Sequence, residues 1–205
     1  MKIEDMVAAV QQKLNIGVDG KAGPTTWRAV YKAIVGDAPP GATGPSGPTA
    51  IAYVDPRSEK NIATLLPEVQ PMARELVHKA TAAGITIRII SGLRSYAEQD
   101  ALYAQGRTAP GNKVTNAKGG YSNHNFGIAF DIGVFEGGSY IGESPKYKAV
   151  GVIGMDLGLE WGGNWVTIVD QPHFQLRPAW ASQMAESDML AAFRERVAAG
   201  KPIFA

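Results

Sequence analysis

Between residues 58 and 205, apolar residues follow a helical period in some stretches and a two-residue period in others. Helical spacing is typical of 67–82, 96–105, 149–158 and 180–199, and β-branched runs at 85–90 and 166–169 are typical of short strands. A further strand begins near Gly127, because Ile128 and Phe130 alternate with small or polar residues. Ala129 and Asp131 then face the opposite side. The pattern therefore predicts a domain of mixed helices and strands.

The first 36 residues carry a separate helical pattern. Apolar residues fall on two helical faces joined by a turn over 19–26: Met6, Val7, Val10 and Leu14 on the first, and Trp27, Val30, Tyr31 and Ile34 on the second. Gly17 can end the first helix. Residues 37–50 are rich in proline and glycine and contain nothing that can build a core. The predicted organisation is a helical module at 1–36, a linker at 37–50 and a larger domain at 51–205.

Composition narrows the possible partners and compartments. A net charge of +1 gives no reason to expect a nucleic-acid or membrane partner. We expect the protein to be a monomer. The absence of cysteine excludes disulfides and thiolate metal sites. The first residues lack the apolar core of a signal peptide, and no apolar run is long enough to span a membrane. We therefore expect a protein that is made in a reducing compartment and later acts outside it.

Two histidines and two carboxylates form the candidate metal-binding chemistry. One stretch holds His124 and Asp131, seven residues apart, and a second holds Asp170 and His173, three residues apart. Three nitrogen or oxygen ligands with one open position are typical of a catalytic zinc site. We interpret His124, Asp131 and His173 as the ligands. Asp170 is then the general base.

This interpretation constrains the local fold. On one straight strand, His124 and Asp131 would lie roughly 23 Å apart and on opposite faces. The chain must therefore turn back between them, and Gly127 permits a turn or bulge. Pro172 favours a turn in the second stretch, which would bring its carboxylate and its imidazole to one side.

Other interpretations of these residues remain open. A histidine beside aromatic residues is commonly a hydrogen-bonded structural residue. His78 lies off the apolar stripe of the 67–82 helix, so we expect it to be solvated. Ser122, His124 and Asp131 could instead serve as nucleophile, base and orienting group. No nucleophile elbow accompanies them, however, and the second stretch would be left without a role.

The motifs around these residues resemble a known peptidase family. Four motifs occur in order between residues 58 and 178: Ser91-Gly92-Leu93-Arg94-Ser95 with Gln99, Ser122-x-His124-x-x-Gly127-x-Ala129-x-Asp131, Leu159-Glu160-Trp161-Gly162-Gly163-Asn164-Trp165, and Asp170-Gln171-Pro172-His173-Phe174. The second motif matches the SxHxxGxAxD signature of the VanY/VanX-like zinc D-Ala-D-Ala peptidases. The whole set is most similar to the phage endolysin branch of that family, the L-alanyl-D-glutamate peptidases.

The resemblance implies a role for each matching residue. By this resemblance, His124, Asp131 and His173 correspond to the zinc ligands. Asp170 corresponds to the catalytic carboxylate, and Arg94 to an arginine near the substrate carbonyl or carboxylate. The expected substrate-binding residues are Ser122, Gln99, Trp161 and Trp165. Because a carboxylate is a harder ligand than an imidazole, manganese or another divalent ion could replace zinc.

The N-terminal pattern has a weaker resemblance of its own. The residues Val10-Gln11-x-x-Leu14, Asp19-Gly20-x-x-Gly23-Pro24-x-Thr26 and Ala29-Val30 resemble the peptidoglycan-binding domain type 1. The module is shorter than the three-helix form of that domain. A helical hairpin that merely packs on the enzyme is the alternative.

With these resemblances, the chain is expected to be an α+β protein: a small helical N-terminal module and a zinc peptidase domain with a small antiparallel sheet flanked by helices. We expect a phage-type endolysin that uses Zn²⁺ to hydrolyse the L-alanyl-D-glutamate bond of peptidoglycan. It would be made in the host cytoplasm and would act on the cell wall at lysis. The alternatives are a zinc D,D-carboxypeptidase or dipeptidase of the same family, a non-catalytic wall-binding protein, and a bacterial wall-remodelling enzyme.

Overall fold

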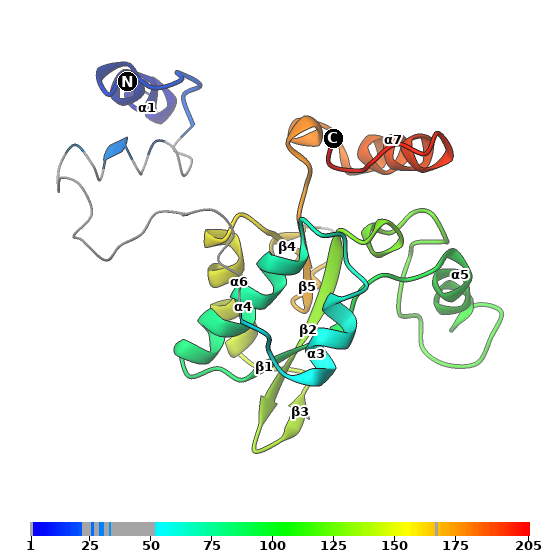
Figure 1. Cartoon of the computed structure of the whole chain (residues 1–205). Coiled ribbons are helices and arrows are strands. Elements are labelled where there is room, and N and C mark those ends of the chain that lie inside the picture. Colours follow the sequence, from blue (N-terminus) through cyan, green and yellow to red (C-terminus); the bar gives the residue numbers. More distant parts are fainter. Residues whose placement is uncertain (1, 22–25, 27–28, 31–32, 34–51, 167) are drawn as a thin grey trace. The chain divides into compact units, whose positions relative to one another are not determined.

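The computed structural model describes residues 2–21, 26, 29–30, 33, 52–166 and 168–205 (Figure 1). The chain divides into two compact units, Met1–Ala50 and Ile51–Ala205. Among the residues described, no helix is long and apolar enough to cross a membrane.

The described part of the first unit is organised around a buried amide. Helix α1 (Ile3–Lys13) carries Gln11, which is only 2% exposed, whereas the expected apolar residues Met6 and Val10 are 46% and 40% exposed. The Gln11 side chain donates to Asp19 Oδ1 at 2.6 Å and to Thr26 Oγ1 at 2.8 Å. Its Oε1 accepts from two backbone amides of the turn at residues 19 and 20. The predicted first helix is confirmed, but it ends at Lys13, before Gly17.

The second predicted helix of this unit is described only in part. Thr26, Ala29, Val30 and Ala33 are helical. Trp27, Tyr31 and Ile34, three residues of its expected apolar face, lie outside the described residues, as does the linker at 37–50.

The second unit is built on an antiparallel sheet, as expected from the sequence. Its strands are β1 (Ile87–Ser91), β2 (Ala129–Glu136), β3 (Ser139–Ile141), β4 (Glu160–Trp161) and β5 (His173–Gln175). The order across the sheet is β1-β2-β5-β4, and β3 forms a hairpin with β2 that projects from the unit in Figure 1. Asp131 on β2 lies directly opposite His173 on β5, and it also pairs with Ser91 after a register shift in β1. The sheet therefore brings the two ligand-bearing stretches into contact.

The second unit also contains helices. They are α3 (Pro56–Ile62), α4 (Gln70–Ala82), α5 (Tyr96–Ala104), α6 (Lys146–Asp156) and α7 (Glu186–Ala198), with short 3-10 helices η1 (Asn123–Phe126), η2 (Gly162–Asn164) and η3 (Ala179–Ala181). Helices α3 and α4 pack on β1, and α6 packs on α4 and β4. The core between them includes Phe130 and Phe174, whose rings stack with centroids 5.8 Å apart. Together these elements form the predicted α+β arrangement.

Two glycines set how closely α6 approaches the sheet. A Cβ atom at Gly151 would lie 2.5 Å from the ring of Trp161, and one at Gly154 would overlap the ring of Phe174. Both rings belong to strands that border the candidate site, Trp161 to β4 and Phe174 to β5. Without these glycines the helix would have to move outward, because protein interiors leave no spare volume.

The strand predicted over 166–169 is wrong. No strand occurs at residues 166, 168 or 169, and Val166 is 99% exposed. The strand that pairs with β2 in this part of the chain begins instead at His173 and runs to Gln175. A β-branched run forms a strand only beside an available partner strand, and Val166, Ile168 and Val169 are exposed.

Other boundaries differ from the prediction in smaller ways. β1 begins at Ile87 instead of residue 85, α4 at Gln70 instead of 67, and α6 at Lys146 instead of 149. The helix predicted over 180–199 is interrupted: η3 comes first, and α7 begins only at Glu186.

Two elements have local signals other than periodicity. α3 begins after Asp55, whose carboxylate accepts hydrogen bonds from the amides of Arg57 and Ser58, with Pro56 in the first turn. The β2–β3 hairpin turns at Gly137 and Gly138, which both have positive φ angles. Aspartate-proline and glycine-glycine pairs would have predicted both elements.

The start of the second unit is tied to its own helices. The Glu59 carboxylate accepts from the Val54 amide at 2.9 Å and pairs with Arg74, whose guanidinium also lies 5.2 Å from the Tyr53 ring centroid. His78 is half-buried, and its Nε2 lies 2.7 Å from the Ala52 carbonyl oxygen, which differs from the expected solvated position. From residue 52 onward, the chain is thus held within this unit.

Candidate metal centre

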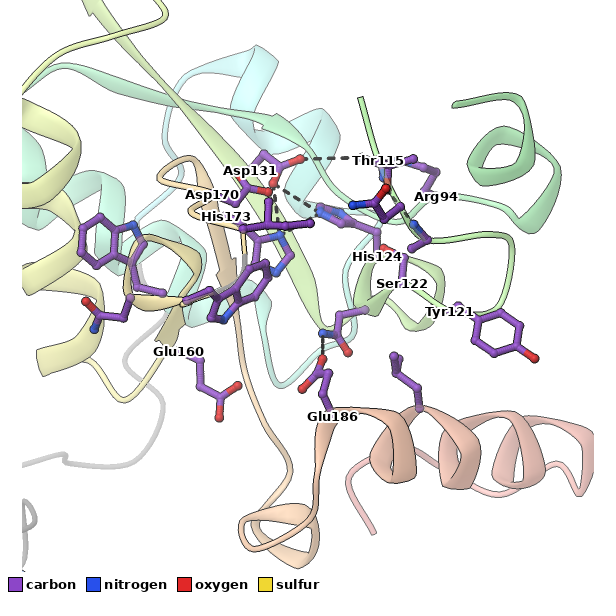
Figure 2. Close-up of a pocket in the computed structure, with 18 of the residues that line it drawn as sticks. Arg94, Thr115, Tyr121, Ser122, His124, Asp131, Glu160, Asp170, His173 and Glu186 are labelled. Carbon is purple, nitrogen blue, oxygen red and sulfur yellow. Dashed lines mark hydrogen bonds and ion pairs between the residues drawn. The ribbon is translucent and has the colours of Figure 1, made fainter. Parts of the chain in front are cut away.

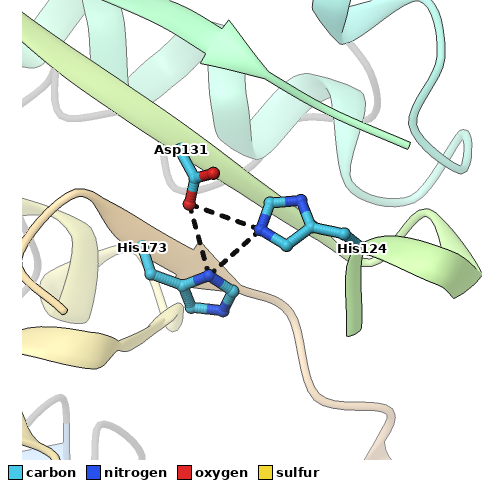
Figure 3. A group of neighbouring side chains, drawn as sticks. All are labelled: His124, Asp131 and His173. Carbon is cyan, nitrogen blue, oxygen red and sulfur yellow. Dashed lines mark hydrogen bonds and ion pairs between the residues drawn. The ribbon is translucent and has the colours of Figure 1, made fainter. Parts of the chain in front are cut away.

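Three side-chain atoms meet in the second unit in the arrangement a tetrahedral metal requires. His124 Nε2 lies 3.3 Å from Asp131 Oδ1, His173 Nδ1 lies 3.3 Å from the same oxygen, and the two nitrogens are 3.2 Å apart (Figure 3). Zinc bonds of about 2.0–2.1 Å in a tetrahedron imply separations of about 3.3 Å between ligand atoms. The three atoms therefore fit one face of a zinc tetrahedron and leave the fourth corner free.

Local backbone geometry brings these ligands together. His124 lies on η1, which ends at Gly127 with a φ of 69° in the left-handed region. This turn reverses the chain before β2, so that Asp131 can face back toward His124, as the spacing requires. A side chain at Gly127 would be strained at this φ and would also approach the Leu66 backbone nitrogen at 3.3 Å.

Hydrogen bonds assign a tautomer to each imidazole. His124 Nδ1 lies 2.8 Å from the Gly92 carbonyl oxygen, which can only accept, so Nδ1 carries the hydrogen and Nε2 has a free lone pair. His173 uses its nitrogens the other way round. Its Nε2 lies 2.9 Å from Gln175 Oε1, and its Nδ1 faces the ligand cluster. Each ring thus offers a lone pair to the same point in space.

The cluster favours a cation. Burial alone would raise the pKa of Asp131, but the two neighbouring imidazoles hold it well below its usual range. Burial would lower the pKa of His173, yet the neighbouring Asp131 carboxylate raises it overall. An ionised carboxylate, only 19% exposed, therefore needs positive charge beside it, which a bound divalent ion can supply.

Asp170 and Arg94 lie beside the three ligands, as expected. The turn at residues 171 and 172 places Asp170 next to His173, whose amide donates to the Asp170 carbonyl oxygen at 3.3 Å. Burial, and then the charge of Asp131, raise the pKa of Asp170. Arg94 follows β1, and its Nη2 lies 3.7 Å from Asp131 Oδ2.

A cleft with a volume of about 1270 Å³ opens over these groups. Of the four residues expected to bind substrate, Ser122, Trp161 and Trp165 line the cleft. The Trp165 ring centroid lies 4.8 Å from that of His173, whereas Trp161 is 7% exposed and donates its indole N–H to the Gln171 carbonyl oxygen. Figure 2 shows Arg94 and Asp131 on one side of the cleft, with Glu160 and Glu186 on the other.

Gln99 differs from the expectation. It is fully buried and does not line the cleft. Its Oε1 accepts from Arg94 Nη1 at 2.8 Å, and its amide nitrogen donates to the Ala117 carbonyl oxygen. Gln99 therefore lies outside the cleft lining and contacts the arginine from the buried side.

The arrangement disfavours the serine-nucleophile alternative. Of the two His124 nitrogens, Nδ1 is bonded to the Gly92 carbonyl oxygen and Nε2 faces Asp131 and His173. Neither nitrogen is therefore available to take a proton from Ser122.

Comparison with known proteins agrees with this geometry. Residues 63–148 match the VanY family model, described as D-alanyl-D-alanine carboxypeptidase. Over 125 residues the chain is 40% identical to the peptidoglycan L-alanyl-D-glutamate endopeptidase CwlK of Bacillus subtilis, a match that covers 56% of this chain and 74% of CwlK. The chain belongs to the VanY family of peptidases.

Other known proteins are also similar to this chain. The L-alanyl-D-glutamate peptidase of Listeria phage A118 is 30% identical over 129 residues, which cover 60% of this chain and 42% of the phage protein. Two solved structures are also similar: the L-Ala D-Glu endopeptidase ChiX of Serratia marcescens (TM-score 0.48, 26% identity, 63% of this chain and 95% of ChiX) and a D,D-pentapeptidase VanY in complex with Zn(II) (TM-score 0.44, 17% identity, 68% of this chain and 81% of that one).

The three histidines allow a matched test of the metal centre. We expect the purified protein to hold one zinc ion, and His124→Ala or His173→Ala to lose it, because each change removes one of three ligands. His78→Ala is the control, since His78 bonds the Ala52 carbonyl oxygen away from the cluster and should leave zinc binding unchanged. Elemental analysis after dialysis measures the zinc content. Full occupancy in either ligand variant would show that these residues do not form the site.

Proposed function

We propose that this protein is a zinc-dependent endopeptidase that hydrolyses the L-alanyl-D-glutamate bond of peptidoglycan. The observation that carries the proposal is the triangle of ligand atoms from His124, Asp131 and His173 at the floor of a cleft, with Asp170 and Arg94 beside it. When bound, zinc supplies Lewis-acid chemistry that polarises a carbonyl and makes water nucleophilic at neutral pH. The bond is proposed from the relatives, CwlK and the phage A118 peptidase, whose names state it.

Asp170 is proposed as the group that moves the proton. It lines the cleft beside His173 and is held by a turn, so its carboxylate can accept a proton from the attacking water and return it to the leaving amine. Its raised pKa makes it a stronger base than an exposed aspartate. As pH falls through that pKa, the carboxylate becomes protonated and the rate should decline.

Arg94 is proposed to bind a carboxylate or the developing oxyanion. Gln99 and Ser91 hold its guanidinium at 2.8 and 3.2 Å, so the side chain is already oriented before substrate arrives. In peptidoglycan the D-glutamate is linked through its side chain, which leaves an α-carboxylate next to the scissile bond. A fixed guanidinium beside the ligand triangle suits that carboxylate.

The family model gives the second candidate function. Its description, D-alanyl-D-alanine carboxypeptidase, names a bond at the other end of the stem peptide. The same metal centre and Asp170 would serve either reaction, so the two functions differ only in how the cleft holds the peptide.

Product analysis distinguishes these two functions. Purified peptidoglycan treated with the protein should release fragments with a new N-terminal glutamate, read by mass spectrometry after amine labelling. Release of free D-alanine instead would support the carboxypeptidase. Absence of any cleavage by the zinc-loaded protein would contradict both and favour a wall-binding role.

A comparison of two aspartates tests the proposed roles. Asp170→Asn keeps the shape of the side chain and removes only its basicity, so zinc content should persist while turnover falls by roughly a hundred- to ten-thousand-fold. Asp131→Asn removes a ligand charge and should weaken zinc binding. Zinc content and turnover are measured for both variants. Loss of zinc in Asp170→Asn, with retention in Asp131→Asn, would mean that the two roles are exchanged.

We further propose that the protein acts as a phage-type endolysin, in which a module at 1–36 binds the wall and residues 37–50 serve as a linker to the peptidase domain at 51–205. The similarity to the Listeria phage peptidase supports the endolysin role. The Gln11 hydrogen bonds support a folded first unit, because they join α1 to the turn that follows it. Tethering such a module raises the effective concentration of the enzyme at its substrate.

A shortened protein tests this organisation. Because residues 52–59 are held by α3 and α4, a protein beginning at Ile51 should fold and cleave soluble muropeptides at the rate of the full chain. Its binding to whole sacculi, measured by co-sedimentation, should be weaker. Equal binding would contradict a wall-binding module. A protein beginning at Lys60 is the control and should be destabilised, since it lacks Ser58, whose Oγ accepts from the Ile89 amide in β1.

A further inference from the structure

Five side chains beside the metal centre form a closed ring of hydrogen bonds, and four of them, Asn123, Glu160, Arg177 and Glu186, line the cleft. The bonds of the ring are Gln175 Nε2 to Glu160 Oε2 at 2.7 Å, Arg177 Nε to Glu160 Oε1 at 2.5 Å, Arg177 Nη2 to Glu186 Oε2 at 2.6 Å, Asn123 Nδ2 to Glu186 Oε1, and Asn123 Nδ2 to Gln175 Oε1 at 2.6 Å. The members come from η1, β4, β5, the segment after β5, and the first residue of α7. None of the five is a proposed metal ligand, but Gln175 Oε1 lies 2.9 Å from His173 Nε2.

We propose that this ring is a positioning device that fixes the tautomer of His173, so that its Nδ1 is always the atom presented to the metal. The inference rests on the proposed function, because it assumes that His173 is a ligand. It adds Gln175, Glu160 and Asn123 as positioning residues that do not touch the metal themselves.

The donor and the acceptor of each bond can be assigned, because a carboxylate or carbonyl oxygen can only accept a hydrogen bond. Glu160 is a carboxylate held by Arg177, so it must receive the Gln175 amide hydrogens. The Gln175 Oε1 then points the other way, toward His173 and Asn123. An oxygen there can only accept, which forces His173 to donate from Nε2 and leaves Nδ1 with its lone pair toward Asp131 and His124.

Asn123 holds the opposite side of the ring at a cost. It lies between two acceptors, Gln175 Oε1 and Glu186 Oε1, so its amide nitrogen must face both. Its own Oδ1 is then buried with no hydrogen-bond partner among the described residues. A buried unpaired acceptor destabilises the fold, yet the alternative amide orientation would place Asn123 Oδ1 against the Gln175 and Glu186 oxygens. The unpaired oxygen shows how strongly the ring dictates orientation.

Burial makes the inner half of the ring rigid. Gln175 is fully buried and Asn123 is 6% exposed, whereas the side chains of Glu160 and Glu186 are 38% and 43% exposed. Arg177 joins the two carboxylates and also donates to the Met184 carbonyl oxygen, just before α7. Water can therefore reach the outer charges but not the Gln175 amide, which contacts His173.

The closing experiment changes the ring without touching a ligand. In Glu160→Gln the side chain at position 160 can donate as well as accept. Gln175 can then turn its amide group, so that its NH₂ group faces His173 in place of its oxygen. In Gln175→Met the amide oxygen is replaced by a thioether sulfur, a much weaker acceptor for the His173 N–H. Both variants should bind zinc roughly ten- to a hundred-fold more weakly, measured by competition with a chelator of known affinity. The matched control is Glu136→Gln, which breaks the Lys146 pair on the exposed hairpin and should leave zinc affinity unchanged.

A second readout separates positioning from simple support of α7. Nitrogen-15 spectra of the histidine rings in the metal-free protein should show one His173 tautomer in the wild type and a mixture in Glu160→Gln. The proposal is overturned if unfolding temperatures fall while zinc affinity and the His173 tautomer stay as in the wild type. It is equally overturned if all variants bind zinc alike. A wild-type protein that binds no zinc overturns the proposed function first, and this inference with it.

Discussion

The register between β2 and β5 is the constraint on which the rest of the site depends. Asp131 lies directly opposite His173, so the pairing of the two strands fixes the backbone positions of two of the three ligand residues. A slip of one residue would turn Asp131 to the other face of the sheet, where Phe130 now packs against Phe174. The aromatic stack and the ligand pair therefore specify the same register from opposite faces.

That placement has an energetic consequence for the fold. The ionised Asp131 and two imidazoles are brought together in a largely buried position, where they are costly unless charge is balanced. A cation bound there would bind the folded chain in preference to the unfolded one and would stabilise it by mass action. Stability and metal loading of this protein are thus linked quantities.

Sequence reasoning could predict the chemistry of the site, and with it the main turns. The odd spacing between His124 and Asp131 requires a reversal, and Gly127 supplies it with a left-handed φ. It could not place the β-branched run near Val166, because whether such a run pairs depends on a partner strand far away in the chain. Nor could it find the ring: Glu160 lies in the third motif without an assigned role, Glu186 carries no local signal, and the two meet through Arg177 only after β5 and α7 have packed. Of the ring members, only Gln175 could be singled out from the sequence, because it is a polar residue on the same strand face as His173.

The two glycines of α6 determine more than helix packing. Gly151 lies against the back of the Trp161 ring, while Trp161 also lines the cleft. Even one added methyl group at that position would force the helix or the indole to move, and a moved indole would change the space that a peptide would occupy. The shape of the cleft floor is therefore set partly from a residue that no substrate can touch. Divergence in substrate preference within such a scaffold can arise on the hidden side of a helix, without any change among the residues that face the ligand.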